Sequence, residues 1–146
     1  GLIHLRKLQM RLLISLLAIL LPLSASAQPQ EGQDWWACQS VASAGLNWEN
    51  RQWKTTRFNH DERFILIAEG DGLQKESVAK AMGSSVASIE CSAWLSTFCI
   101  DVGGQSFGFM PDTGNGAMTS IFGGVQASGR EDRDALIVTP FECTKG

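Results

Sequence analysis

The chain has 146 residues, with 12 lysines and arginines against 15 aspartates and glutamates, so its formal net charge is −3. This length suits one domain, and five tryptophans with seven phenylalanines can fill a core. An acidic surface repels phosphate backbones and anionic lipid at long range, which argues against nucleic acid as a partner.

The first 27 residues are expected to lie outside the fold. Residues 10–27 read MRLLISLLAILLPLSASA, a charged start followed by an apolar run and a small-x-small end. This pattern is typical of a secretory signal peptide (Met10–Ala27), and the run is shorter than the roughly twenty apolar residues of a membrane span. An N-terminal membrane anchor is the alternative. We therefore expect a periplasmic or secreted protein with no stable membrane insertion after signal cleavage.

Removal of this leader changes the charge of the remaining chain. It leaves 9 basic and 15 acidic residues, a net charge of about −6, because the leader carries three basic residues and no acidic one. Residues 28–34 are polar and predict a flexible N-terminal leader to the fold. Residues 35–146 are expected to form a single disulfide-stapled β domain.

All four cysteines follow the signal peptide: Cys38, Cys91, Cys99 and Cys143. An even number in an exported chain predicts disulfides, with three possible pairings. If the stretches ASIECSA and TFCIDVG form a hairpin around a WLS loop, Cys91 faces Cys99 at a spacing close to that of a disulfide. Cys38 then pairs with Cys143 by elimination. Closely spaced C-x2–4-C zinc pairs and the redox motif C-x-x-C are both missing.

The elements are taken in chain order. Asp34 is expected to cap a short helix that ends at Gly45, with an irregular segment as the alternative. The alternating runs 51–58 and 63–70, joined by the turn NHDE, predict a β-hairpin. Residues 73–83 have the best helical pattern. The disulfide-linked hairpin follows.

Three strands are expected near the end of the chain, in QSFGFM, AMTSIFGGV and DALIVTPFEC. Residues 126–134 are expected to form a charged hairpin tip between the last two. Seven or eight short strands without strand–helix alternation predict a mainly β protein, a small antiparallel up-and-down β-barrel with one or two short helices. A bond from Cys38 to Cys143 would tie the two ends of this barrel. A β-sandwich is the alternative.

No catalytic constellation stands out. His60 beside Asp61 offers a general base, but a polar turn residue is the favoured interpretation. The serine, metalloprotease and lactamase motifs are missing. PDTGNG lacks the further acidic ligands of a calcium loop. The sequence therefore predicts no enzyme, with no catalytic residue, no metal site and no cofactor.

Tryptophans suggest where a partner binds. Trp48 and Trp53 are expected in the core, whereas Trp35 and Trp94 are candidates for the surface, where indole rings stack on sugars or anchor interfaces. The charged tip adds two cations. The candidate binding surface therefore comprises Trp35, Trp94, Arg130 and Arg133, near the mouth of the barrel.

Most of the mature chain resembles small exported proteobacterial proteins of unassigned function. The resemblance rests on the segments GLNWENRQWKTTRF and RDALIVTPFEC. This resemblance implies no activity. Gly45-Leu46-Asn47-Trp48 is similar to the G-x-W of the first lipocalin strand, which implies an up-and-down barrel. The motif here is one residue longer, and the lipocalin T-D-Y is missing because the chain has no tyrosine.

These features predict a non-enzymatic periplasmic or secreted β-barrel protein that binds an unknown small molecule or an envelope or host protein. The alternative is a protein–protein interaction module, such as an inhibitor of a cell-wall or host enzyme. An acidic module would suit a basic target because electrostatic attraction speeds encounter.

Overall fold

The computed structural model describes residues 28–59, 61–93, 97–121 and 134–146. In chain order its elements are β1 (Trp35–Ser40), β2 (Ala44–Glu49), β3 (Gln52–Arg57), β4 (Arg63–Glu69), β5 (Gly72–Leu73), α2 (Lys75–Met82), the 3-10 turn η1 (Val86–Ser88), β6 (Ile89–Ala93), β7 (Thr97–Asp101), β8 (Gln105–Met110), β9 (Asn115–Ser120) and β10 (Leu136–Lys145). The helix α2 lies within the predicted range and ends at Gly83, whose φ of 67° suits glycine.

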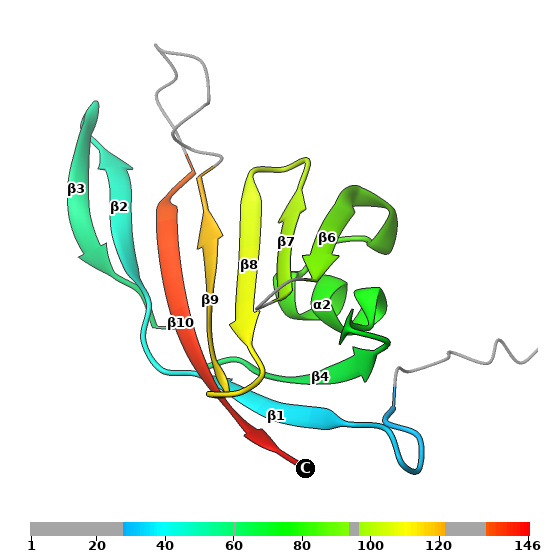
Figure 1. The fold of residues 1–146 in the computed structure, drawn as a ribbon. Helices are drawn as coiled ribbons and strands as arrows, with labels where there is room; N and C mark the ends of the chain where they lie inside the picture. The colour runs from blue at the N-terminus through cyan, green and yellow to red at the C-terminus, as the bar shows by residue number, and fades with distance from the viewer. Residues whose placement is uncertain (1–27, 60, 94–96, 122–133) are drawn as a thin grey trace, which may run out of the picture.

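Eight strands form an antiparallel sheet that curls until it is nearly closed into a barrel, in the order β5-β4-β1-β10-β9-β8-β7-β6 (Figure 1). Strands β6 to β10 form a meander. The other edge of β10 pairs with both β1 and β2. The helix α2 lies within the curve, against β4 (Figure 1). The predicted fold class, mainly antiparallel β with a barrel-like sheet and a short helix, is confirmed.

The helix predicted from Asp34 to Gly45 is wrong, because this stretch forms β1 and the start of β2. In β1 every second side chain is buried, namely Trp36, Cys38 and Ser40. Burial therefore repeats every two residues, as in a strand. Pairing with β10 on one edge and β4 on the other fixes this conformation, and neither contact is visible in the local pattern.

The hairpin predicted between residues 51–58 and 63–70 is also wrong. Strand β3 pairs with β2, whereas β4 pairs with β1 and β5. The tight turn lies earlier, at Asn50 and Arg51, whose φ angles of 50° and 63° are both positive. Two such residues make a type I′ turn, which matches the twist of a two-residue hairpin.

Strands β1 and β2 lie end to end along one edge of β10. Ser40 is opposite Phe141 and Ala44 is opposite Val138, so three junction residues face two residues of β10. This is a β-bulge, and Pro140 of β10 lies at it, where a missing N–H is tolerated. Beyond the bulge the sheet divides, since β1 continues to β4 while β2 continues to β3.

Aromatic side chains fill the inside of the barrel. Phe107, Phe109 and Phe141 are almost completely buried. The Phe141 ring stacks on Phe107 with 5.5 Å between centroids and meets Phe64 edge-on at 5.0 Å. Trp36 meets Phe109 edge-on at 5.3 Å. The buried face of α2 joins the same cluster, so rings and helix together occupy the interior.

The placement of Trp48 and Trp53 in this core is wrong. Both are partly buried, and they pack on each other in the β2–β3 hairpin beside the barrel. Trp36, which lies in the stretch predicted as a helix, enters the core instead. Alternation shows that an aromatic face is covered, but it does not show which part of the molecule covers it.

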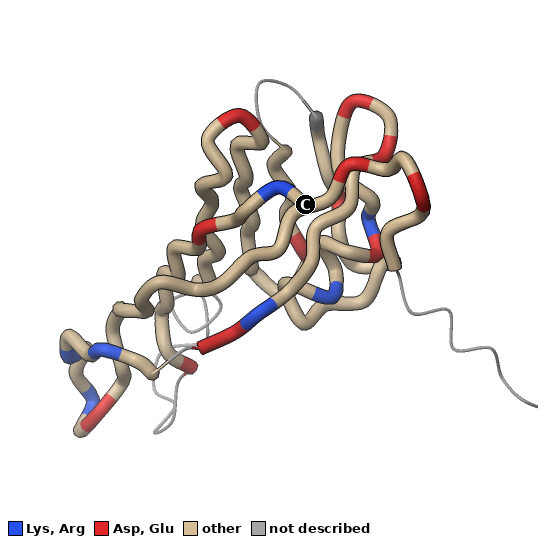
Figure 2. The backbone as a smooth tube through the Cα atoms, turned by 90° about the horizontal axis from the view of Figure 1, so that it is seen from below, with Lys and Arg blue, Asp and Glu red and all other residues tan. Residues whose placement is uncertain are grey.

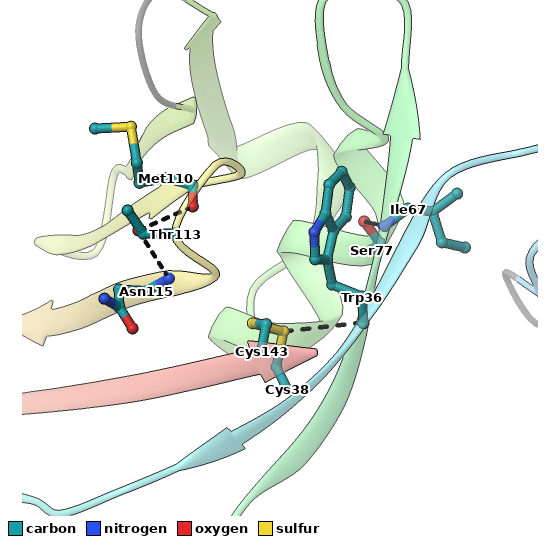
Figure 3. Close-up of a disulfide and its surroundings, with 8 residues drawn as sticks. All are labelled: Trp36, Cys38, Ile67, Ser77, Met110, Thr113, Asn115 and Cys143. Carbon is teal, nitrogen blue, oxygen red and sulfur yellow. Dashed lines mark hydrogen bonds between the residues drawn. A yellow bond between two sulfur atoms is a disulfide. The ribbon is translucent and has the colours of Figure 1, made fainter. Parts of the chain in front are cut away.

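Two disulfides are present, Cys38–Cys143 and Cys91–Cys99, and these are the pairs that the spacing favours. Both join directly opposed residues of antiparallel strands. Figure 3 shows Cys38–Cys143 close to Trp36, with Thr113 of the β8–β9 turn and Asn115 at the start of β9 nearby. Disulfides form and persist in oxidising compartments, which indicates an extracellular or periplasmic location.

Candidate binding surface

Two open clefts lie at the barrel mouth near the end of α2, among the described residues. They have volumes of about 260 and 440 Å³, share Glu62, Ala81 and Met82, and are open to solvent. The rings of Phe107 and Phe141 are almost completely buried and stack on each other in the core.

The β2–β3 hairpin, residues 44–57, projects beside β10 as a two-stranded ribbon (Figure 1). We call these residues the ribbon. Gly45 permits the close approach of the ribbon to β10, because a Cβ there would overlap the Leu136 carbonyl oxygen. The bulge and this glycine together position the ribbon against the first residues of β10.

One face of the ribbon is apolar. Trp48 and Trp53 are directly opposed across the strands, and their rings meet edge-on with centroids 5.0 Å apart. Such aromatic pairs add about 0.5–1.5 kcal/mol beyond their buried area. Leu46 is paired with Leu136 of β10, so the strand pleat places both beside the tryptophans.

This apolar surface continues onto the barrel as a groove of about 290 Å³. The groove lies over β2, β10 and β9, and Val138 in its floor is 51% exposed. We call the combined surface the ribbon face, and its residues are Leu46, Trp48, Trp53, Ile121, Leu136 and Val138. Ile121 in the same groove is 55% exposed, and exposed apolar surface on a soluble domain is a candidate interaction site.

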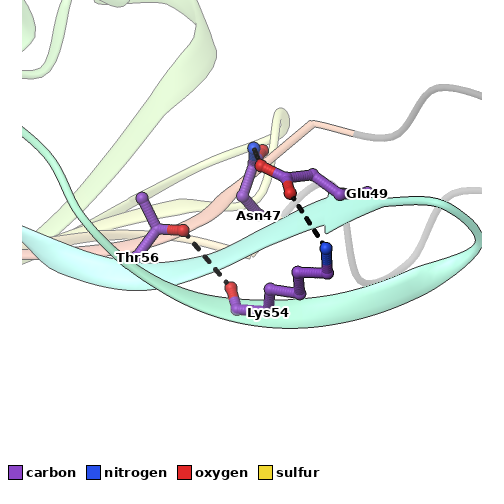
Figure 4. A network of polar contacts seen from close by, with 4 residues as sticks. All are labelled: Asn47, Glu49, Lys54 and Thr56. Atoms are coloured by element: carbon purple, nitrogen blue, oxygen red, sulfur yellow. Dashed lines mark hydrogen bonds and ion pairs between the residues drawn. The ribbon is translucent and has the colours of Figure 1, made fainter.

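The opposite face of the ribbon is polar (Figure 4). Asn47 Nδ2 donates to Glu49 Oε1 at 3.0 Å, and Lys54 Nζ approaches Glu49 Oε2 at 3.3 Å. The hydrogen bond from Asn47, followed by the hydrogen bond and charge of Lys54, lowers the pKa of the Glu49 carboxyl below its ordinary value. Lys54 thus forms its ion pair within the ribbon.

Charge is unevenly distributed between ribbon and barrel (Figure 2). The ribbon carries three cations, Arg51, Lys54 and Arg57, against one carboxylate. The remaining described residues carry four cations and twelve carboxylates. Arg51 and Arg57 are exposed, and no described carboxylate forms an ion pair with either. A cationic ribbon therefore projects from an acidic protein.

Of the predicted surface residues, the structure describes only Trp35, which lies away from the ribbon. Trp35 begins β1, at the end remote from β2, and its ring covers Gly146, whose N–H donates to the Trp35 carbonyl at 3.0 Å. Trp94, Arg130 and Arg133 lie outside the described residues, as does His60.

The described strand ends that flank Trp94 and the charged tip lie at opposite ends of the sheet. Thr97 pairs with Phe109 near the end of β8. Ile121 N donates to Gly104 O, just before β8 begins.

The ribbon face itself was missed by sequence reasoning, although WENRQW places two tryptophans symmetrically around a two-residue turn.

A partly buried hydrogen-bond network joins the end of α2 to the β7–β8 turn. Ser84 Oγ donates to Asp101 Oδ2 at 2.6 Å, and Gln105 N donates to Asp101 Oδ1 at 3.0 Å. Burial disfavours the charged carboxylate, but hydrogen bonds from Ser84, Gln105 and Gly103 outweigh it and lower the pKa of Asp101.

Replacing Asp101 by asparagine should lower the free energy of unfolding by about 1–2 kcal/mol near pH 7. Because the folded pKa is below the unfolded pKa, this contribution is present above the unfolded value and is lost as pH falls through the folded one. Urea unfolding near pH 7 and near pH 3 measures the change. The exposed Glu90→Gln is the control, and a difference between wild type and Asp101→Asn that stays constant down to about pH 3 would contradict the assignment.

Among the described residues, no three metal-ligating side chains lie together and no helix is long and apolar enough to cross a bilayer. Comparisons with known protein families, curated proteins and solved structures give no match. The geometry of the chain itself therefore carries the functional argument.

Proposed function

We propose that this protein is a non-enzymatic binding domain that docks another protein on its ribbon face. The observation that carries the proposal is the contrast between a barrel interior filled by Phe107, Phe109 and Phe141 and an outer surface with an exposed apolar groove. A small-molecule carrier of the barrel type would need an enclosed internal cavity.

The composition of the ribbon face fits a protein interface. Tryptophan and arginine are enriched among the residues that dominate interface energies, and the aliphatic groove provides an apolar surface beside them. Trp48 and Trp53 lie at the margin of the groove, with Arg57 on the same face of β3. The net charge of the chain suits a cationic target, but the ribbon suits an acidic one, so we favour an acidic partner.

We also propose that the protein acts in the periplasm or outside the cell, after export directed by residues 10–27. The signal-like pattern and the two disulfides support this location. The partner would then be an envelope, extracellular or host protein. If that partner is a cell-wall or host enzyme, the domain would act as its inhibitor.

Affinity capture from the envelope extract and medium of the producing cell tests the proposal. Val138→Arg should reduce recovery of a specific partner about tenfold or more, because it places a charge in the groove. The matched control is Ile65→Arg in β4, since Ile65 is also an exposed apolar residue but lies outside the groove. Equal recovery with both variants, or recovery of no partner by the wild type, would refute docking on the ribbon face.

A further inference from the structure

We infer that the outer edge of β3 accepts an extended acidic segment of the partner as an added strand. This inference rests on the proposed function, and it specifies how the partner is held. Strand addition uses backbone hydrogen bonds for affinity and side-chain contacts for specificity. The ribbon supplies the edge, an apolar face and two arginines.

Hydrogen bonding within the ribbon shows which backbone groups of β3 point outward. Pairs alternate between hydrogen-bonded and non-hydrogen-bonded along antiparallel strands, and the pair that flanks a two-residue turn, here Glu49 and Gln52, is hydrogen-bonded. At the other end Phe58 N donates to Ser43 O at 2.9 Å, in the same phase. Thr55 and Arg57 therefore direct their N–H and C=O groups away from β2.

Within the described part of the chain, β3 pairs with β2 and with no other strand. Edge strands in native proteins are usually shortened, covered or interrupted by proline. Strand β3 has six residues, no proline, and threonines at two central positions. The edge is thus suited to pairing, and its main protection is charge.

That charge selects the occupant. Edge-to-edge pairing of two copies would bring the cations of both ribbons together, which costs free energy at low ionic strength. An acidic strand would instead place carboxylates near Arg51 and Arg57, neither of which has a described ion-pair partner. Because Arg57 lies on the same face of β3 as Trp53, that face of the added strand needs an apolar side chain opposite Trp53 and a carboxylate opposite Arg57. An acidic segment with an apolar residue at the position of Trp53 therefore fits best.

The experiment uses a capped seven-residue peptide of Glu and Val, with one Val and one Glu placed four residues apart so that they share a face and can meet Trp53 and Arg57, titrated into the full chain by calorimetry. We expect binding that weakens as salt rises, and no binding by the corresponding Lys and Val peptide. The same Glu and Val peptide with alternate backbone nitrogens methylated should bind about tenfold more weakly or not at all, because it cannot complete the ladder.

Two substitutions locate the site. Thr55→Pro removes an outward N–H without removing a bond to β2 and should weaken the Glu and Val peptide about tenfold or more, whereas Thr55→Ala should not. Arg57→Glu should have a similar effect, whereas Arg63→Glu in β4 should not. Circular dichroism of the Trp48–Trp53 pair shows whether each variant keeps the ribbon.

Equal binding of the acidic and basic peptides, or wild-type binding by Thr55→Pro with the ribbon intact, would overturn strand addition. A dimer that Thr55→Pro dissociates would overturn it too, because the edge would then be occupied by a second copy. If Val138→Arg loses the captured partner while Thr55→Pro retains it, docking on the ribbon face stands and strand addition alone fails.

Discussion

Replacing Cys38 and Cys143 together by serine should lower the free energy of unfolding by about 4–5 kcal/mol, and replacing Cys91 and Cys99 by about 2–3 kcal/mol. The difference arises because the first bond closes a loop of sequence separation 105 and the second a loop of 8. In the chain-entropy model, a longer loop removes more conformations from the unfolded chain.

Denaturant unfolding of the two double variants measures these losses, with the oxidised wild type as reference. The β1–β10 pairing also supports the ribbon, so the Cys38 and Cys143 variant should lose cooperativity of unfolding in that region first. A larger loss from the Cys91 and Cys99 variant would contradict the dominant role assigned to the long loop.

Replacing Phe141 by alanine should lower the free energy of unfolding by about 3–5 kcal/mol. The Phe141 ring is 1% exposed and contacts the rings of Phe64, Phe107 and Phe109. Removing it leaves a cavity that the strands on either side of β10 cannot close, because β1 and β9 are fixed by their own ladders.

The matched control for this second result is Phe98→Ala. Phe98 lies in β7 on the outer surface and is 48% exposed, so its truncation should cost about 1 kcal/mol or less. Thermal and urea unfolding of both variants provide the comparison. Similar losses for the two phenylalanines would show that the ring cluster does not govern stability.

The sequence predicts well where local pattern and local contacts agree. The register of the β6–β7 hairpin follows from the Cys91 and Cys99 spacing, since a three-residue loop sets these residues opposite each other. The helix α2 and strands β8 to β10 follow from period and turn residues alone. In each case neighbouring segments of the chain provide the main partners.

It predicts poorly where distant pairing decides conformation. The segment from Trp36 to Ser40 lies within the stretch predicted as a helix, but β10, about a hundred residues away, pairs with it as a strand. The ribbon is a hairpin of neighbouring residues, but the sequence NHDE has a stronger turn pattern than Asn50-Arg51. The reason is that arginine rarely adopts a positive φ. The apolar groove depends on β2, β9 and β10 meeting, which no single segment indicates.

The position of β10 has a consequence for how the chain reaches its native state. This one strand completes the ladders of β1, β2 and β9, and its pairings with β1 and β2 join residues far apart in the sequence. Topologies of that kind have high contact order and fold slowly. Until β10 has paired, strands β1, β2 and β9 each keep an open hydrogen-bonding edge, so a newly synthesised chain has a period in which chaperones can hold it.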